Sequence, residues 1–189
     1  MTGDSGLSTP PRLWLSVLVM LIGMMLSPKA TIAETVIQRE DRIKAALIFK
    51  LVKFVEWPAT AMNGKDPIQI CALGDSRVGE ALSAVDGKPT RDRLAQFRRI
   101  ASLSPTEFKG CHVLYVPSAA RELGVGVPFA LRGRSILTVS DAPDFARRGG
   151  MVCLGQGENK LSFEINLRNT REGGLEPGAP LLELATIIE

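Results

Sequence analysis

The segment ILTVSDAPDFARRGGMVCL, from Ile136 to Leu154, contains residue types that occur in active sites and ligand sites. An apolar run ends there in Ser140 and Asp141, and the pair Gly149-Gly150 follows. Open α/β sheets place their ligand-binding groups at the carboxyl ends of strands, which is where Asp141 falls. The segment therefore either carries chemistry or only shapes a strand end and a tight connection.

The side chains around this segment do not make a catalytic set. Acyl transfer needs a nucleophile, a base and a group that orients the base. His112 is the only histidine, and its place directly after Cys111 in an apolar run favours a hydrogen-bonded structural role. Ser140 lacks the Gly-x-Ser-x-Gly turn that exposes a nucleophile. Asp141 and Asp144 are spaced for turns and helix capping, so we predict that the chain is not an enzyme.

The glycines do not predict a phosphate or dinucleotide site either. Gly149-Gly150 stands before a strand-like run, whereas a phosphate-binding loop opens a helix. The stretch from Gly124 to Pro128 lacks the third glycine and the preceding strand of a dinucleotide motif, and we expect a loop there. A single histidine without clustered ligands argues against a zinc site. We expect no cofactor and no metal.

The charge balance argues against a nucleic-acid partner. The formal net charge is only +3, whereas nucleic-acid binding calls for a concentrated basic patch. The doublets Arg98-Arg99 and Arg147-Arg148 lie among acidic residues. We interpret both doublets as solvated surface.

The first residues have the layout of an export signal. Arg12 precedes an apolar run over residues 13–26, which is shorter than the roughly 20 residues of a membrane-spanning helix. Thr31 and Ala33 have the small size and the spacing that signal peptidase accepts. We expect cleavage before Glu34, which leaves residues 34–189 as one domain in the periplasm, without stable membrane insertion. The alternative is an uncleaved membrane tether.

Three cysteines have to be interpreted in an oxidising compartment, where one pair and one remaining thiol are expected. Cys71 and Cys111 each lie in a strand-like run. A bridge between them would close a long loop and stabilise the fold by about 4 kcal/mol; the alternative is two buried free thiols. Cys153 has no obvious partner, and we expect a free thiol or, less favoured, an intermolecular link.

The pattern over residues 39–56 predicts a helix that lies flat on a sheet. Its apolar residues cover about half of the helix circumference at a period near 3.6; they are Ile43, Leu47, Ile48, Leu51, Val52, Phe54 and Val55. Lys44 falls inside this apolar arc. It either extends its ammonium group to solvent near the helix start or forms a buried ion pair with an acid on a strand.

After this helix, strand-like and helical segments alternate. Strands are predicted at 68–74, 111–116 and 135–141, with a weaker candidate at 97–101, and helices at 76–85, 118–124 and 127–133. Runs at 149–155 and 160–168 predict a β-hairpin at a sheet edge, and 179–188 predicts a closing helix. The fold class is therefore α/β, with a mostly parallel or mixed sheet of about five to six strands flanked by helices.

A set of ordered motifs then resembles the YfiR family of periplasmic proteins, from about Ile43 to Ile188. The motifs are Lys44-Ala45-Ala46, Phe54-Val55-Glu56-Trp57-Pro58, Ile70-Cys71, Leu73-Gly74, Cys111-His112-Val113-Leu114, Leu137-Thr138-Val139-Ser140-Asp141, Phe145, Gly149-Gly150-Met151, Phe163-Glu164-Ile165-Asn166 and Leu181-Leu182. Their order is far more specific than any single motif.

The resemblance implies a small α/β domain, often a homodimer, with no known enzymatic activity. Members bind the periplasmic part of an inner-membrane diguanylate cyclase and repress it, so that envelope or redox stress reaches cyclic-di-GMP synthesis. Cys71 and Cys111 match the long-range disulfide of the family. Some relatives have a second, close cysteine pair where this chain has Cys153 alone, so the resemblance does not extend to redox switching there. The alternative function is a periplasmic small-molecule-binding sensory domain, supported by the strand-end crevice of this architecture.

Strand alternation places Glu164 and Asn166 on the polar face of the stretch LSFEINL, residues 161–167. Three roles are open for this polar pair: an ion pair between Glu164 and Lys44, hydrogen bonds that hold the following loop, or contact with the partner cyclase.

Overall fold

The structure is a computed structural model that describes residues 30–62, 64–156 and 161–188. The chain divides after Ile37 into two units. Of the first unit, only the start of helix α2 (Ala30–Phe54) is described, so most of the predicted export signal lies outside the described residues. The unit from Gln38 onward contains the sheet and the remaining helices.

A mixed sheet dominates this unit, with eight strands in the described residues in the order β10-β8-β7-β6-β5-β2-β4-β3. The strands are β2 (Ile68–Leu73), β3 (Pro89–Thr90), β4 (Arg93–Ile100), β5 (Val113–Val116), β6 (Leu137–Ser140), β7 (Val152–Gln156), β8 (Leu161–Asn166) and β10 (Thr186–Ile188). Five neighbouring strands run parallel: β4, β2, β5, β6 and β7. Strand β3 is antiparallel to β4, and β8 is antiparallel to β7. The predicted fold class is confirmed.

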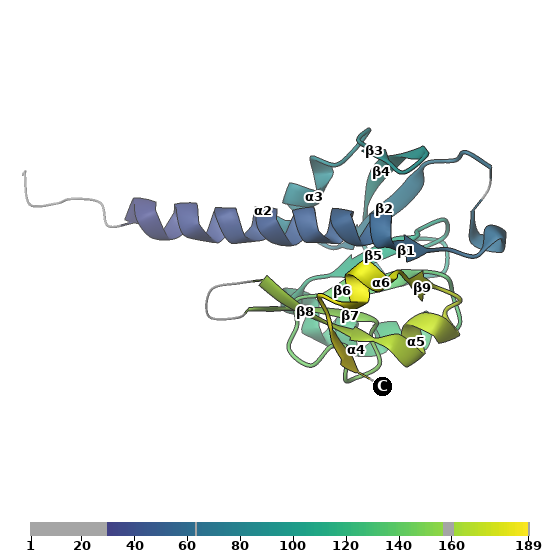
Figure 1. The fold of residues 1–189 in the computed structure, drawn as a ribbon. Helices are drawn as coiled ribbons and strands as arrows, with labels where there is room; N and C mark the ends of the chain where they lie inside the picture. Colours follow the sequence, from purple (N-terminus) through teal and green to yellow (C-terminus); the bar gives the residue numbers. More distant parts are fainter. Residues whose placement is uncertain (1–29, 63, 157–160, 189) are drawn as a thin grey trace, which may run out of the picture. The chain divides into compact units, whose positions relative to one another are not determined.

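Side-chain alternation along the central strands produces a core on each face of the sheet. Ile70 and Ala72 of β2 belong to one core, together with residues of α2 and of α3 (Arg77–Ser83). Cys71 and Leu73 of the same strand point into the other core, which includes residues of α4 (Arg121–Ala130). Helices therefore cover both faces (Figure 1), which explains why the central strands read as continuous apolar runs.

Helix α2 lies on the sheet as predicted, but its buried face is rotated from the predicted centre. Ile48, Leu51 and Val52 are buried, whereas Ile43 and Phe54 are 45% and 39% exposed. Residues 41, 44, 48 and 52 follow one another at helical spacing along the buried side. The stripe that meets the sheet therefore includes two charged residues, Asp41 and Lys44.

The segment after β5 differs from the prediction of two short helices separated by a loop at 124–128. A 3-10 turn, η2 (Ser118–Ala120), leads into α4, and Pro128 lies inside that helix. Val127 and Leu131 are buried against the sheet. Their burial favours a continuous helix in spite of the hydrogen bond that a proline removes.

At the end of the chain the predicted hairpin of β7 and β8 and a following helix are present, but the helix is shorter than predicted. Helix α6 stops at Leu182 (Ala179–Leu182), and β10 then pairs with β8 in parallel. Strand β10 thus replaces the second half of the predicted closing helix, and it moves the hairpin strand β8 away from the sheet edge. The β-branched residues Thr186, Ile187 and Ile188 favour a strand where a neighbouring strand offers pairing. The hairpin loop over 157–160 lies outside the described residues.

One more helix and a separate pair of short strands also belong to this unit. Helix α5 (Leu167–Glu172) follows β8 directly, because the side chain of Asn166 accepts a hydrogen bond from the amide of Asn169 and caps the helix. Strands β1 (Val55–Glu56) and β9 (Glu176–Pro177) form a separate antiparallel pair. No helix among the described residues has the length and hydrophobicity that crossing a membrane requires.

The pair Gly149-Gly150 is explained by the turn before β7. Gly149 adopts a φ of +100°, which favours glycine. A Cβ at Gly150 would overlap the ring of Phe145. We predict that Gly150→Ala lowers the free energy of unfolding by about 2 kcal/mol through overpacking, measured by denaturant unfolding.

Gly126→Ala is the matched control, because no atom lies within 4 Å of a Cβ at that helical position. This control should leave stability unchanged or raise it by up to about 1 kcal/mol. Equal stability of the Gly150→Ala variant and wild type would contradict the packing argument.

Candidate functional site

The strand-end acid Asp141 is the centre of a buried polar cluster. Its carboxylate accepts hydrogen bonds from Lys44 Nζ at 3.1 Å, from the Tyr115 hydroxyl at 2.9 Å and from the Ser118 amide at 2.8 Å. Strands β5 and β6 are parallel neighbours, with Val116 opposite Ser140. The segments that follow the two strands therefore meet at the same edge of the sheet, which brings Ser118 to Asp141.

Lys44 reaches this strand end from helix α2. Its ammonium group also pairs with Glu40, one helical turn earlier, at 2.9 Å. The side chains of Lys44 and Asp141 are 11% and 12% exposed, so water screens their pair only weakly. Of the two alternatives for Lys44, the buried ion pair with a strand acid is the one present in the structure, and its acid is Asp141.

The partners in this cluster hold the ion pair in its charged form. Burial favours the neutral form of Lys44, but hydrogen bonds and charges from Glu40 and Asp141 outweigh it and raise the lysine pKa. Burial likewise disfavours the Asp141 carboxylate, and hydrogen bonds from Ser118, Lys44 and Tyr115 outweigh that effect and lower its pKa. Burial and the Asp141 charge raise the pKa of Tyr115. The side chains therefore keep their charges near neutral pH and are poorly suited to proton transfer. The cluster of Lys44, Glu40, Asp141, Tyr115 and the Ser118 amide is called the clamp below.

Asp41 lies beside the clamp, and its pKa is shifted in the opposite direction from that of Asp141. Burial raises its pKa above the ordinary value, although Lys44 and Arg77 lower it in part. Its Oδ2 atom is buried without a hydrogen-bond partner in the described part of the chain. The charge of Asp41 therefore works against folding, whereas the charge of Asp141 supports it.

The proposed ion pair between Glu164 and Lys44 is not present. Glu164 instead accepts a hydrogen bond at 2.7 Å from Arg147, which lies in the loop before β7. Strand β8 is separated from β6 by β7, so Glu164 lies away from the strand end that Lys44 occupies. The side chains of Arg147 and Glu164 are 55% and 26% exposed, and this ion pair lies at the surface.

Asn166 has a structural role, which corresponds to the second of the three alternatives. It is 8% exposed, its side-chain amide donates to the Ala146 carbonyl, and its oxygen caps α5. Asn166 thus holds the loop before β7 and the start of α5 to the end of β8. Of the polar pair on this strand, only Glu164 remains a candidate for contact with a partner.

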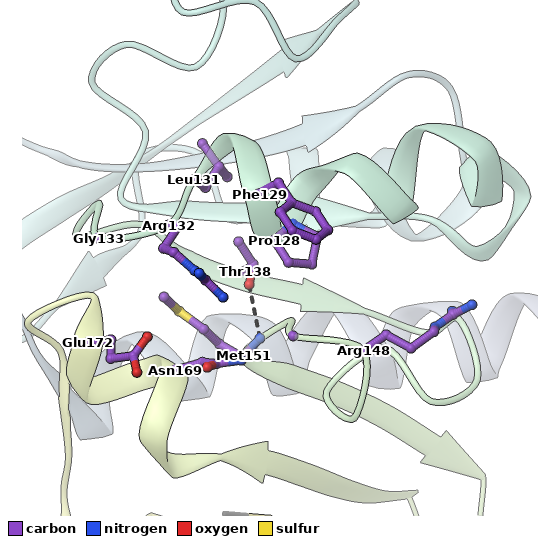
Figure 2. A pocket seen from close by; sticks show the side chains of 11 residues that line it. Pro128, Phe129, Leu131, Arg132, Gly133, Thr138, Arg148, Met151, Asn169 and Glu172 are labelled. Atoms are coloured by element: carbon purple, nitrogen blue, oxygen red, sulfur yellow. Dashed lines mark hydrogen bonds between the residues drawn. The ribbon is translucent and has the colours of Figure 1, made fainter.

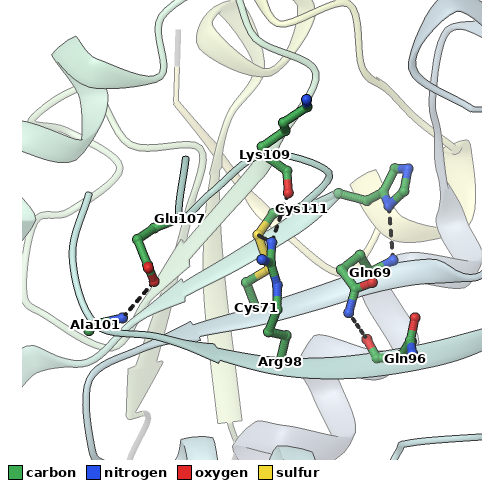
Figure 3. Close-up of a disulfide and its surroundings, with 9 residues drawn as sticks. Gln69, Cys71, Gln96, Arg98, Ala101, Glu107, Lys109 and Cys111 are labelled. Atoms are coloured by element: carbon green, nitrogen blue, oxygen red, sulfur yellow. Dashed lines mark hydrogen bonds between the residues drawn. A yellow bond between two sulfur atoms is a disulfide. The ribbon is translucent and has the colours of Figure 1, made fainter. Parts of the chain in front are cut away.

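Cys71 and Cys111 form a disulfide in the structure, between β2 and the segment before β5. Figure 3 shows the guanidinium of Arg98, from β4, beside the two sulfur atoms. Arg98 donates to Cys111 Sγ at 3.4 Å and to the Lys109 carbonyl at 2.8 Å. The disulfide and this arginine thus join β2, β4 and the chain before β5, so the doublet Arg98-Arg99 is only partly solvated surface.

His112 and Cys153 do not act as reactive groups in this arrangement. His112 accepts from the Gln69 amide through Nδ1 at 2.9 Å, and its Nε2 donates to the Ala61 carbonyl at 3.1 Å. Burial lowers the histidine pKa, which keeps the ring neutral. Cys153 is a buried free thiol that donates to the Ala142 carbonyl, and burial raises its pKa. A buried thiol of raised pKa is a poor nucleophile.

A small pocket lies between α4, the turn before β7 and α5 (Figure 2). Its volume is about 60 Å³, and its lining includes Phe129, Arg132, Arg148 and Glu172. The floor is closed by the hydrogen bond from the Met151 amide to the Thr138 hydroxyl at 3.0 Å. Ligand pockets usually have volumes of several hundred Å³, so this pocket does not fit a cofactor.

Sequence reasoning missed Tyr115 and Asp41 as members of the cluster. A tyrosine in an otherwise apolar buried strand was the available signal, because a buried phenol needs a hydrogen-bond partner. Asp41 gave no such signal, since its burial depends on which face of α2 meets the sheet. Among the described residues, no group of three potential ligands could hold a metal ion.

A family model described as YfiR/HmsC-like matches residues 41–186. The matched span begins at Asp41 in α2. It includes Lys44 and Asp141, the disulfide and strands β2 to β8.

Replacing Asp141 or Asp41 by the neutral asparagine should change the stability of the fold in opposite directions. We predict that Asp141→Asn lowers the free energy of unfolding by about 2 kcal/mol at pH 7, because it removes one of the two carboxylates that pair with the buried Lys44 ammonium group. Asp41→Asn should raise the melting temperature slightly, because it removes a charge that burial disfavours. Thermal and urea unfolding of both variants, compared with wild type, measure the difference.

The pH dependence follows from the lowered pKa of Asp141. Its ionised form stabilises the fold above the unfolded-state pKa of about 3.9, and this stabilisation is lost as the pH falls through the folded-state pKa. The stability gap between wild type and Asp141→Asn should therefore shrink below about pH 4. A gap that stays constant down to acidic pH would contradict the role of this carboxylate.

Proposed function

The chain belongs to the YfiR/HmsC-like family, and we propose that it is a periplasmic regulatory protein that represses an inner-membrane diguanylate cyclase. It does so by binding the periplasmic part of the cyclase, and envelope or redox stress relieves the repression. The observation that carries this proposal is the family match over residues 41–186, which spans most of the chain.

The side-chain chemistry supports binding rather than catalysis. The strand-end carboxylate of Asp141 is saturated by Lys44, Tyr115 and Ser118. The ring nitrogens of His112 are both engaged with the backbone. These groups hold the fold together, and the described residues offer no nucleophile with a base beside it.

The proposal includes export. The leader over residues 1–33 is removed before Glu34, and residues 34–189 act in the periplasm as one domain. The disulfide of Cys71 and Cys111 supports this location, because such bonds form and persist in oxidising compartments. In the free state the regulator is a homodimer, which light scattering of the purified protein tests.

We place the contact with the cyclase around Glu164 and Arg147. Their ion pair is exposed enough to be rearranged by a partner, and Asp144 extends the charged surface at 3.9 Å from Arg147. Exposed ion pairs contribute only about 0–1 kcal/mol to stability. Loss of this pair should therefore leave the stability of the fold nearly unchanged, so that a loss of repression reports on contact with the partner.

A combined assay tests both the function and the contact. We predict that the wild-type protein co-purifies with a membrane diguanylate cyclase and lowers cellular cyclic-di-GMP. The free energy of unfolding of Glu164→Ala should lie within about 0.5 kcal/mol of the wild-type value. The variant should nevertheless fail to bind the cyclase and to lower cyclic-di-GMP.

Glu176→Ala is the matched control, because it breaks a comparable exposed pair, with Arg171, at 2.9 Å. This variant should repress normally. If wild type captures no cyclase and leaves cyclic-di-GMP unchanged, the proposed function is wrong; if Glu164→Ala represses like the control, only the contact surface is wrong.

A further inference from the structure

A second pocket lies where α2 ends, away from the clamp and from Glu164. Its volume is about 250 Å³. Val52, Met62 and Ile68 supply apolar wall, and Trp57, Thr90 and Arg91 supply polar groups. This volume is slightly below that of typical drug-sized ligand sites, so it fits a compact molecule.

Two wall residues of this pocket carry buried polar atoms without partners. The indole Nε1 of Trp57 and the hydroxyl oxygen of Thr90 make no hydrogen bond in the part of the chain that the structure describes. Thr90 is only 2% exposed. A buried polar atom left unsatisfied destabilises the folded state, because it has lost its hydrogen bonds to water. Both atoms are closed off from solvent as the side chains stand, so a bound molecule reaches them only after these side chains turn towards the pocket.

The third polar group is a backbone-anchored arginine. Arg91 donates through Nε to the Lys53 carbonyl at 2.8 Å, which holds its side chain against the end of α2. Its terminal nitrogens make no hydrogen bond to any other described residue. Arg91 also has a φ of +52°, which is strained for a residue with a side chain. This φ belongs to the two-residue connection between β3 and β4, in which Thr90 pairs with Arg93, and it fixes the position of Arg91 at the pocket.

Four charged residues line the pocket: Arg91, Arg93, Glu56 and Asp92. Arg93 donates to the carbonyls of Asp66 and Gly64 and thereby shapes the wall, while Asp92 pairs with Arg93 and is 68% exposed. Glu56 is exposed and carries the opposing charge at the rim. The donors in the wall are an indole N–H, a hydroxyl and a guanidinium, and a carboxylate is the acceptor that matches all three.

We propose that this pocket binds a small carboxylate with a compact apolar body. The carboxylate accepts hydrogen bonds from Trp57 Nε1, the Thr90 hydroxyl and Arg91, after the two buried side chains turn about their single bonds towards the pocket. The apolar body packs against Val52, Met62 and Ile68. The site is independent of the proposed repression, because neither Glu164 nor Arg147 belongs to it.

The indole signal of Trp57 in ¹⁵N NMR spectra of the full chain reports on the site directly. The signal is assigned by its loss in Trp57→Phe, since Trp14 gives the other indole. Benzoate and propionate are the probes, and benzylamine is the matched cation. We expect a saturable downfield shift of the Trp57 indole proton with a carboxylate probe and no saturable shift with benzylamine.

Two variants then separate ligand binding from a water-filled gap. Thr90→Val should bind the carboxylate about tenfold more weakly, since it loses one hydrogen bond to a charged group. The same variant without ligand should be more stable than wild type, because it removes an unsatisfied hydroxyl. Glu56→Gln should bind more tightly, because it removes the opposing rim charge. Thr106→Val, in an exposed loop, is the control that should change neither property.

The outcomes that overturn the proposal are equally defined. They are an indole signal that responds to neither carboxylate at millimolar concentration, an equal response to benzylamine, or unchanged affinity in Thr90→Val. Loss of stability in ligand-free Thr90→Val would show that the hydroxyl is already satisfied by water. None of these results bears on cyclase repression, which is measured separately.

Discussion

The ion pair between Lys44 and Asp141 joins the first helix of the domain to the carboxyl edge of the sheet. A buried ion pair is tolerated only when its remaining hydrogen-bonding capacity is satisfied. Glu40, Tyr115 and Ser118 provide that, and they come from three separate elements. This arrangement fixes α2 at the carboxyl edge of the sheet, while Ile48, Leu51 and Val52 pack the rest of the helix against the core.

The disulfide provides a second constraint at a different place. It links β2 to the segment before β5, while Arg98 of β4 donates to its sulfur and to the chain beside it. Strand β2 lies between β4 and β5 in the sheet, so this cluster joins three neighbouring strand segments. Ion pair and disulfide together hold the central strands to both the helix and each other.

This arrangement changes where binding chemistry is to be sought. In open α/β sheets the strand-end crevice is the usual ligand site. Here the acid at that position, Asp141, is already paired with Lys44. The strand-end crevice was the basis for the alternative function of small-molecule binding, and the paired Asp141 no longer offers a free ligand group there. Exposed or unsatisfied polar groups instead lie around Glu164 on β8 and around Trp57 at the end of α2.

The local pattern of the chain was sufficient for the fold class and for the central strands. The runs that became β2, β5 and β6 are mainly apolar, because helices cover both faces of these parallel strands. The sequence also favoured the disulfide, because an exported chain favours paired over free cysteines and because Cys71 and Cys111 match the long-range pair of the family that the chain resembles.

Long-range pairing was decided only by the tertiary structure. The partner of Lys44 is 97 residues away, and a helical pattern states which residues share a face but not which strand end that face meets. Glu164 pairs with Arg147, and not with Lys44, because β7 lies between β8 and β6. Residues 186–188 are a strand because β8 offers an edge, whereas their local sequence also fitted a helix. Side-chain type and spacing set the local structure, but the choice among possible partners comes from sheet order, which no short segment encodes.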